Sequence, residues 1–227
     1  MKRLIMGAAI LMSMSGSRAW AEPVPSYIQD SVGAWLIATD DGKPGCNVSL
    51  SADRVGDHFK IAPSSDCASR LPTVSRATSW NYDSGVRLFA ADGSLLLEFA
   101  EDETTIMKTS FETPPVHFMV PAKSGVDHAP FAPALVGSWV LQRPGGPTLC
   151  PLVLNKDAQS DDTELTVKTG SPCDGAVARL KLDSARVEDF TLMLYGKPET
   201  SLSFEPSGSD RFTKTETGKP LEMVRAH

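Results

Sequence analysis

The chain has 227 residues, of which 41% are hydrophobic, and its formal net charge at pH 7 is −6. The acidic balance argues against a nucleic-acid partner, because phosphate binding depends on clustered Lys and Arg side chains. The length is enough for one large domain or two small ones.

Residues 1–21 have the three parts of a secretory signal peptide. Lys2 and Arg3 lie near the start, a short apolar run follows, and residues 19–21 read Ala-Trp-Ala. The apolar run is shorter than the roughly 20 residues that cross a bilayer, which favours a cleaved signal over a retained anchor. We therefore expect cleavage after Ala21, a periplasmic or secreted protein, and no membrane span. Without residues 1–21 the basic count falls from 22 to 19 against 28 acidic residues, a formal charge of −9.

Residues 22–31 read E-P-V-P-S-Y-I-Q-D-S and follow the predicted cleavage site. Pro23 and Pro25 restrict φ and favour extended backbone, so the sequence predicts an N-terminal extended segment. From these residues alone, a frayed terminus without a role is the better explanation.

A motif near the start of the first predicted domain occurs again 104 positions later. Residues 32–35 read Val-Gly-Ala-Trp and residues 136–139 read Val-Gly-Ser-Trp. Each Trp is followed eleven residues later by a Cys, and a second Cys follows 21 or 23 residues after the first. The ordered agreement indicates an internal duplication. Further along, we align Leu88 with Leu192.

Short β-rich runs alternate with turn signals in both copies. Residues 47–50, 86–90 and 95–99 are runs of this kind, and Asp-Gly pairs at 41–42 and 92–93 are typical of hairpin turns. Each copy of roughly 90 residues would then hold seven or eight short strands, which indicates a small antiparallel barrel or sandwich. Residues 66–74 and 173–180 are candidates for short helical turns instead.

The two copies define the predicted domain organisation. The first domain covers residues 32–120 and the second covers residues 135–227. Between them, residues 121–134 contain three prolines and a glycine, a composition typical of a linker.

The repeated Trp and Gly residues are predicted to be structural. Trp35 and Trp139 are interpreted as side chains that plug one end of each barrel, in preference to ligand-stacking residues. Gly33 and Gly137 would let the first strand of each barrel kink or approach a neighbour closely.

The four Cys residues allow three pairings in an oxidising compartment. The duplication favours Cys46–Cys67 and Cys150–Cys173, since each copy should close its own loop. A metal site is the weaker alternative, because no Cys-x-x-Cys spacing occurs and no His accompanies either pair.

The sequence offers no set of catalytic residues. The four His residues are scattered, and neither a Gly-x-Ser-x-Gly nucleophile elbow nor a glycine-rich phosphate loop is present. We expect no catalytic activity, no cofactor and no metal site in this chain.

Taken in order, these residues resemble the bacterial alkaline metalloprotease inhibitor family, Inh. Gly33, Trp35, Cys46 and Cys67, with the turn at residues 91–93, carry the resemblance in the first copy. Gly137, Trp139, Cys150 and Cys173 repeat most of it in the second copy. The second copy has no counterpart of Trp80, and Gly-Lys-Pro replaces the Asp-Gly turn.

The resemblance implies an all-β fold: two tandem eight-stranded antiparallel barrels, lipocalin- or streptavidin-like, each with one disulfide. It also implies that the N-terminal segment enters the active site of a secreted zinc metalloprotease of the serralysin type. The inhibitory residues would be Glu22, Pro23, Val24, Pro25 and Ser26, with the Glu22 amine as a ligand to the target's zinc. The second copy follows a linker, so it has no free amine for the same chemistry. We expect a monomer.

Two other classes of function remain compatible with the sequence. One is a calyx-type binding protein that holds an apolar ligand inside a barrel, although eight short strands leave little room there. The other is a structural envelope protein of the periplasm.

Overall fold

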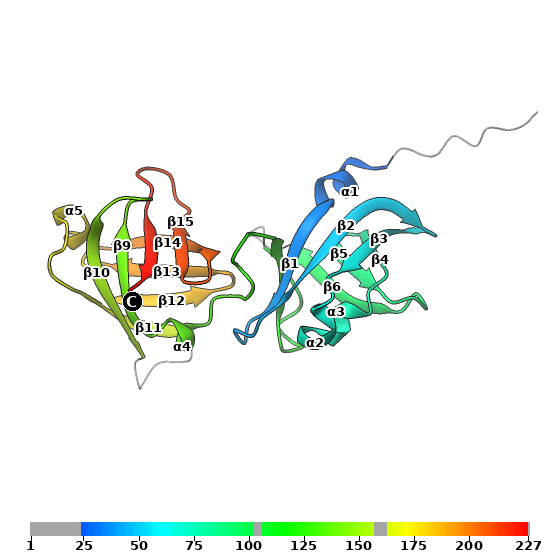
Figure 1. The fold of residues 1–227 in the computed structure, drawn as a ribbon, viewed down its shortest axis with the longest axis horizontal. Coiled ribbons are helices and arrows are strands. Elements are labelled where there is room, and N and C mark those ends of the chain that lie inside the picture. Colours follow the sequence, from blue (N-terminus) through cyan, green and yellow to red (C-terminus); the bar gives the residue numbers. More distant parts are fainter. Residues whose placement is uncertain (1–23, 102–105, 157–162, 227) are drawn as a thin grey trace, which may run out of the picture.

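The computed structural model describes residues 24–101, 106–156 and 163–226. Within them the chain forms two closed eight-stranded antiparallel β-barrels, drawn in succession along the chain in Figure 1. The all-β prediction of two tandem barrels is confirmed. Within the described ranges, no helix is both long enough and apolar enough to cross a membrane.

The first barrel is a meander in which each strand pairs with its sequence neighbour and the last strand pairs with the first. Its strands are β1 (Gly33–Thr39), β2 (Cys46–Val55), β3 (His58–Pro63), β4 (Ser79–Tyr82), β5 (Gly85–Phe89), β6 (Leu95–Glu101), β7 (Met107–Lys108) and β8 (His117–Pro121). A short helix, α1 (Ser26–Ser31), precedes β1, while α2 (Cys67–Arg70) and α3 (Pro72–Ser75) lie between β3 and β4.

The second barrel repeats the same strand order. Its strands are β9 (Gly137–Gln142), β10 (Thr148–Lys156), β11 (Glu164–Thr169), β12 (Ser184–Glu188), β13 (Thr191–Gly196), β14 (Thr200–Gly208), β15 (Arg211–Lys214) and β16 (Glu222–Arg225). Helix α4 (Ala132–Leu135) precedes β9, and α5 (Gly175–Ala178) follows the second Cys of this copy. The expected helical turns near residues 66–74 and 173–180 are therefore present.

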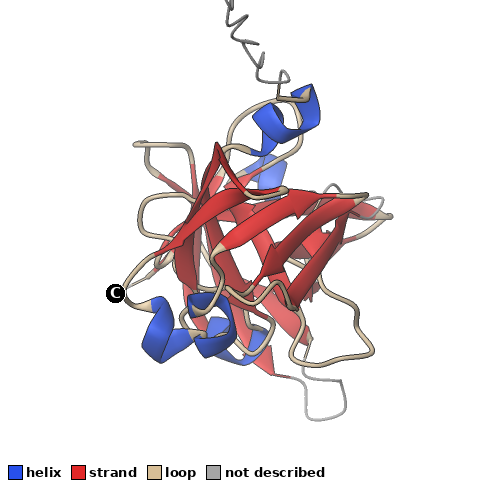
Figure 2. Cartoon of the chain, turned by 90° about the vertical axis from the view of Figure 1, so that its right-hand side faces the viewer, coloured by secondary structure: helices blue, strands red, loops and turns tan. Residues whose placement is uncertain are grey.

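The helices lie at the ends of the barrels. Helix α1 is at one end of the first barrel, and α2 and α3 are at the opposite end (Figures 1 and 2). This placement follows from the chain path, because α1 leads into the start of β1 whereas α2 begins at the Cys that bonds to the start of β2.

Each barrel has its own core of inward-facing side chains. In the first barrel Trp80 and Phe99 are fully buried, and in the second barrel Trp139 and Phe204 are fully buried. Leucines such as Leu50 and Leu88 in the first barrel fill the remaining space. The interior of the first barrel is thus packed with side chains, which does not favour the calyx-type alternative.

The strand register corrects one detail of the repeat alignment. Val86 lies opposite the buried Phe99, and Leu192 lies opposite the buried Phe204. Leu192 therefore corresponds to Val86, and the counterpart of Leu88 is Leu194, so aligning Leu88 with Leu192 was wrong by two residues. A shift of two residues leaves every side chain on the same face of the sheet, so the alternating sequence pattern could not reveal the misalignment.

The glycine of each Gly-x-Trp motif is required by its backbone conformation. Gly33 has φ of +149° and Gly137 has φ of +132°, values that side-chain-bearing residues rarely adopt. A Cβ at Gly33 would meet no atom within 4 Å. Close approach of a neighbouring chain, which the sequence also suggested, therefore does not explain the glycine at position 33.

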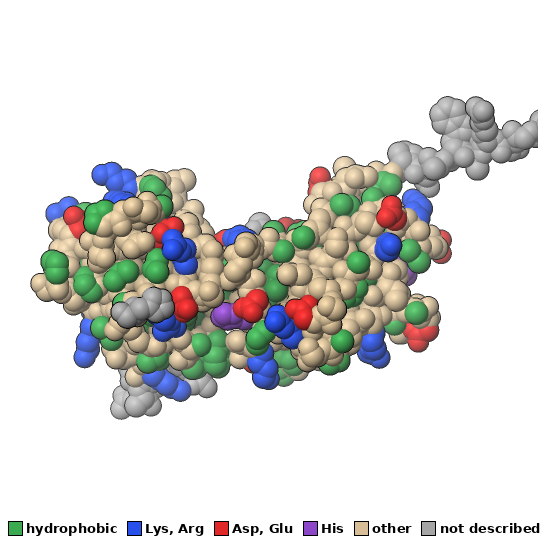
Figure 3. Space-filling model, in the orientation of Figure 1, with side chains coloured by type: hydrophobic (Ala, Val, Ile, Leu, Met, Phe, Trp, Pro, Cys, Tyr) green, Lys and Arg blue, Asp and Glu red, His purple; other side chains and the backbone are tan. Residues whose placement is uncertain are grey.

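A third hydrophobic cluster joins the two barrels. Leu36 and Ala38 face outward from β1, opposite in direction to the core residue Ile37. They pack with Phe118 of β8, with the connecting residues Val126 and Ala129, and with Phe190 of the β12–β13 turn. The surface is hollowed between the two barrels (Figure 3).

Polar contacts reinforce the junction. Lys108 of β7 bonds both carboxylate oxygens of Asp189 at 2.9 Å, with side chains only 11% and 19% exposed. The amide of Gly45 donates to the carbonyl of Asp127 at 2.7 Å. The segment expected to be a linker, residues 121–134, thus includes the end of β8 and the start of α4 and is packed against the first barrel.

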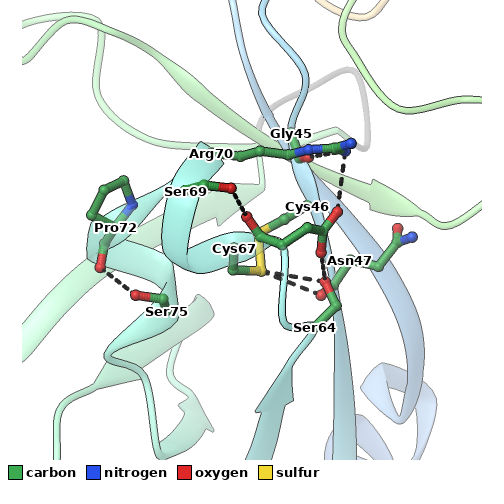
Figure 4. The surroundings of a disulfide bond; sticks show 10 residues. Gly45, Cys46, Asn47, Ser64, Cys67, Ser69, Arg70, Pro72 and Ser75 are labelled. Carbon is green, nitrogen blue, oxygen red and sulfur yellow. Dashed lines mark hydrogen bonds and ion pairs between the residues drawn. A yellow bond between two sulfur atoms is a disulfide. The ribbon is translucent and has the colours of Figure 1, made fainter.

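Both expected disulfides are present. Cys46 and Cys67 connect β2 to α2 with Cα atoms 5.1 Å apart, and Cys150 and Cys173 lie with Cα atoms 4.1 Å apart. Beside the first disulfide, Arg70 donates to the carbonyl of Gly45 at 3.0 Å, which ties α2 to the start of β2 (Figure 4). Closing loops of this length stabilises a small domain by about 3 kcal/mol.

Candidate functional site

The N-terminal segment departs from its predicted conformation. Glu22 and Pro23 lie outside the described residues. Val24 packs against the core cluster of the first barrel, and Ser26–Ser31 form helix α1. The expectation of an extended segment over residues 22–31 was therefore wrong for its second half.

Helix α1 forms because one of its side chains is buried in the barrel. Ile28 is 2% exposed and belongs to the first core cluster. Pro25 immediately precedes the helix, and its carbonyl accepts hydrogen bonds from the amides of Ile28 and Gln29. The ring of Tyr27 lies 5.8 Å from that of Tyr82 on β4. The prolines restrict only the residues before the helix, so they could not reveal it.

The two repeated Trp side chains make the same hydrogen bond. The indole nitrogen of Trp35 donates to the carbonyl of Ser31, the last residue of α1, at 2.9 Å. In the second barrel, Trp139 donates to the carbonyl of Leu135, the last residue of α4, at 2.8 Å. The Gly-x-Trp motif thus joins a short helix to the first strand of each barrel.

The surroundings of the two indoles differ. Trp139 is 1% exposed, with Phe212 against its edge and the Arg225 guanidinium 4.3 Å above its ring. By strand register, Pro121 pairs with Trp35 as Arg225 pairs with Trp139. Without an arginine at that position, Trp35 is only partly buried. The plug interpretation therefore describes Trp139 better than Trp35.

Trp35 lines a cleft of about 470 Å³. The cleft is bounded by α1, by one end of the first barrel, by the connecting segment and by the second barrel. Its lining residues are Tyr27, Asp30, Ser31, Trp35, Tyr82, Glu101, Ile106, Met107, Met119, Val120, Pro121, Lys123, Val126, Phe190 and Glu205. Apart from Trp35, none of these residues carried a sequence signal that predicted such a site. The available signal was proline at position 121, where the second copy has Arg225.

The charged groups of the cleft are mostly acidic. Lys123 forms an ion pair with Glu205 at 2.7 Å. Asp30 and Glu101 form no ion pair with any of the described residues. The cleft therefore combines aromatic and apolar side chains with two carboxylates that form no ion pair within the described part of the chain.

The described residues hold no candidate metal centre, since no three His, Cys, Asp or Glu side chains among them gather closely enough to bind an ion. One histidine is perturbed: partial burial lowers the pKa of His117, at the start of β8, against a weaker opposing hydrogen bond to the Pro115 carbonyl.

Residues 27–114 match the family model described as protease inhibitor Inh. Over these residues the first barrel is similar to the protease inhibitor Inh family. The match begins within α1 and ends before β8, so it does not include the second barrel. No curated protein matches the chain. This similarity supports a role as a protease inhibitor with a protease as its partner.

The second barrel shares strand order, similar disulfide spacing and the helix-to-Trp hydrogen bond with the first barrel. The structural similarity between the two barrels rests on these shared features.

Proposed function

We propose that the protein inhibits a secreted zinc metalloendopeptidase of the serralysin type, and that residues 22–25 enter the active site of that protease. The observation that supports this most directly is the Inh family match, combined with a helix that fixes the root of the segment. Because α1 is anchored by Ile28 and Val24 packs against the same core, residues 24–25 hold a defined position at the end of the first barrel.

The chemistry of the proposed segment suits a zinc site. Cleavage after Ala21 leaves an α-amino group on Glu22 with a pKa of roughly 7.7–8.0, so the neutral amine is available near neutral pH. Zinc in a protease keeps an open coordination position that such a nitrogen can fill. Pro23 and Pro25 lack an N–H group, which makes the segment a poor substrate for the enzyme that binds it.

Helix α1 shortens the segment ahead of it from ten residues to four, and Val24 must leave its contact with the barrel core for all four to extend. Four extended residues span at most about 14 Å, compared with about 35 Å for ten. With this short reach, the amine can approach the metal only if the α1 end of the first barrel lies directly against the protease. The helix also reduces the entropy lost when the segment docks.

The test compares three forms of the chain against a serralysin-type protease: one beginning at Glu22, one beginning at Ser26, and one beginning at Glu22 with its α-amine acetylated. Deletion and acetylation should each weaken inhibition by about 100-fold, or about 2.7 kcal/mol. Thermal melts of the three forms are the control for folding, because the form that begins at Ser26 also loses the Val24 contact and the Pro25 carbonyl that accepts hydrogen bonds from α1. The acetylated form keeps both and isolates the effect of the amine. Full inhibition by the chain that begins at Ser26 would refute the proposal.

A further inference from the structure

The cleft beside α1 is built by both barrels. Phe190 and Glu205 come from the second barrel, whereas Trp35, Tyr82 and Glu101 come from the first. The third hydrophobic cluster and the Lys108–Asp189 ion pair hold these two walls together. The cleft therefore depends on the second barrel, which the Inh family match does not cover.

The cleft also adjoins the root of the proposed inhibitory segment. Tyr27, Asp30 and Ser31 are residues of α1, the helix that immediately follows residues 22–25. Since four residues reach only about 14 Å, a protease bound to the segment must lie close to this cleft.

The lining indicates what the cleft can bind. Tyr27, Trp35 and Tyr82 supply aromatic rings, which attract cations as well as apolar groups. Met107 and Met119 add adaptable apolar surface. Asp30 and Glu101 supply negative charge, while the cation of the cleft, Lys123, is already paired with Glu205.

We infer that the second barrel completes a binding cleft whose occupant is a basic side chain flanked by apolar residues, presented by a surface loop of the target protease. The inference rests on the proposed function for the identity of the partner. Charge complementarity selects a basic side chain, the aromatic and methionine lining selects apolar neighbours, and the volume of about 470 Å³ fits a few side chains rather than a whole element.

The cleft can be tested without a protease, because the chain from Glu22 contains four methionines. Met107 and Met119 line the cleft, whereas Met193 and Met223 do not. The experiment labels the methionine methyl groups with ¹³C and titrates the acetylated, amidated peptide Ala-Leu-Arg-Leu-Ala, followed by its neutral counterpart Ala-Leu-Gln-Leu-Ala. The Arg peptide should shift the Met107 and Met119 signals in a saturable manner and leave those of Met193 and Met223 in place.

Substitutions then separate the parts of the cleft. The double variant D30N/E101Q should weaken binding of the Arg peptide about fivefold, because two exposed charge interactions are lost. E205Q should also weaken binding, since it leaves the Lys123 cation unpaired in the cleft. Asp92→Asn is the matched control, because Asp92 lies in the β5–β6 turn, at the other end of β6 from Glu101, and it should have no effect.

Three outcomes would overturn the inference: no shift of Met107 and Met119, equal shifts with the Arg and Gln peptides, or unchanged binding in D30N/E101Q. None of these outcomes bears on whether residues 22–25 block the protease, which the deletion in the previous section tests separately.

Discussion

Glycine at the start of each barrel illustrates how one residue determines local structure. Gly33→Ala places a Cβ in open space but forces alanine to φ near +149°. The strain should lower the free energy of unfolding by about 1–3 kcal/mol, measured by chemical denaturation of the disulfide-intact protein. Ala34→Gly, at the next and exposed position, is the control for a general effect on β1. A stability loss below about 0.5 kcal/mol in Gly33→Ala would contradict the conformational argument.

His117 gives the folded state a pH dependence. Burial lowers the pKa of His117 below the usual 6.5. At a pH between the folded-state pKa and 6.5, the unfolded chain therefore binds more protons than the folded chain. Stability should therefore fall as the pH is lowered from 7 to 5. His117→Gln should flatten this dependence, as measured by thermal melts at half-unit pH intervals. A slope identical to that of the unsubstituted protein would show that His117 does not cause it.

Among the short elements, α1 depends on a single buried apolar side chain. An isolated six-residue helix is unstable in water, so its formation relies on Ile28 in the barrel core. Ile28→Ala should raise the amide hydrogen-exchange rates of residues 28–32 at least tenfold while the barrel strands stay protected. Gln29→Ala, on the exposed face of the helix, is the control. Unchanged exchange in Ile28→Ala would mean that other contacts hold the helix.

The elements show which features the sequence could predict. Strands and disulfides were predictable from the sequence. Alternating apolar residues and turn residues indicate the strands, and the repeated Trp–Cys spacing indicates which Cys residues pair. Helices α1 and α4 were missed because they are only six and four residues long, each has a proline at its start or within its first turn, and only tertiary burial stabilises them. The cleft was missed for a related reason, since it depends on which residue of β8 is paired with Trp35 of β1.

At the scale of the whole molecule, the junction between the barrels was also hidden in the sequence. Leu36 and Phe118 sit at outward-facing strand positions, where alternation predicts polar residues. A single repeat unit gives no reason for these apolar residues. Their partners lie in the connecting segment and in the β12–β13 turn of the other copy, which local patterning cannot identify.

Phe190 is the residue through which the second barrel reaches both the junction and the cleft. It is 6% exposed, packs edge-on against Phe118 with ring centroids 6.0 Å apart, and follows Asp189, the partner of Lys108. Phe190→Ala should leave each barrel folded, because Phe190 belongs to neither barrel core. It should, however, let the barrels move apart, since truncating a buried Phe removes about 3 kcal/mol or more of packing energy.

Small-angle X-ray scattering would detect the change as a larger radius of gyration and a broader distance distribution. Val153→Ala, a partly exposed position on β10, is the matched control and should leave the scattering curve unchanged. An unchanged radius of gyration in Phe190→Ala would show that other contacts, such as the Lys108–Asp189 and Lys123–Glu205 ion pairs, are sufficient to hold the two barrels together. If the barrels separate, the wall that Phe190 and Glu205 contribute is lost, and the methionine signals of the cleft should no longer respond to the Arg peptide.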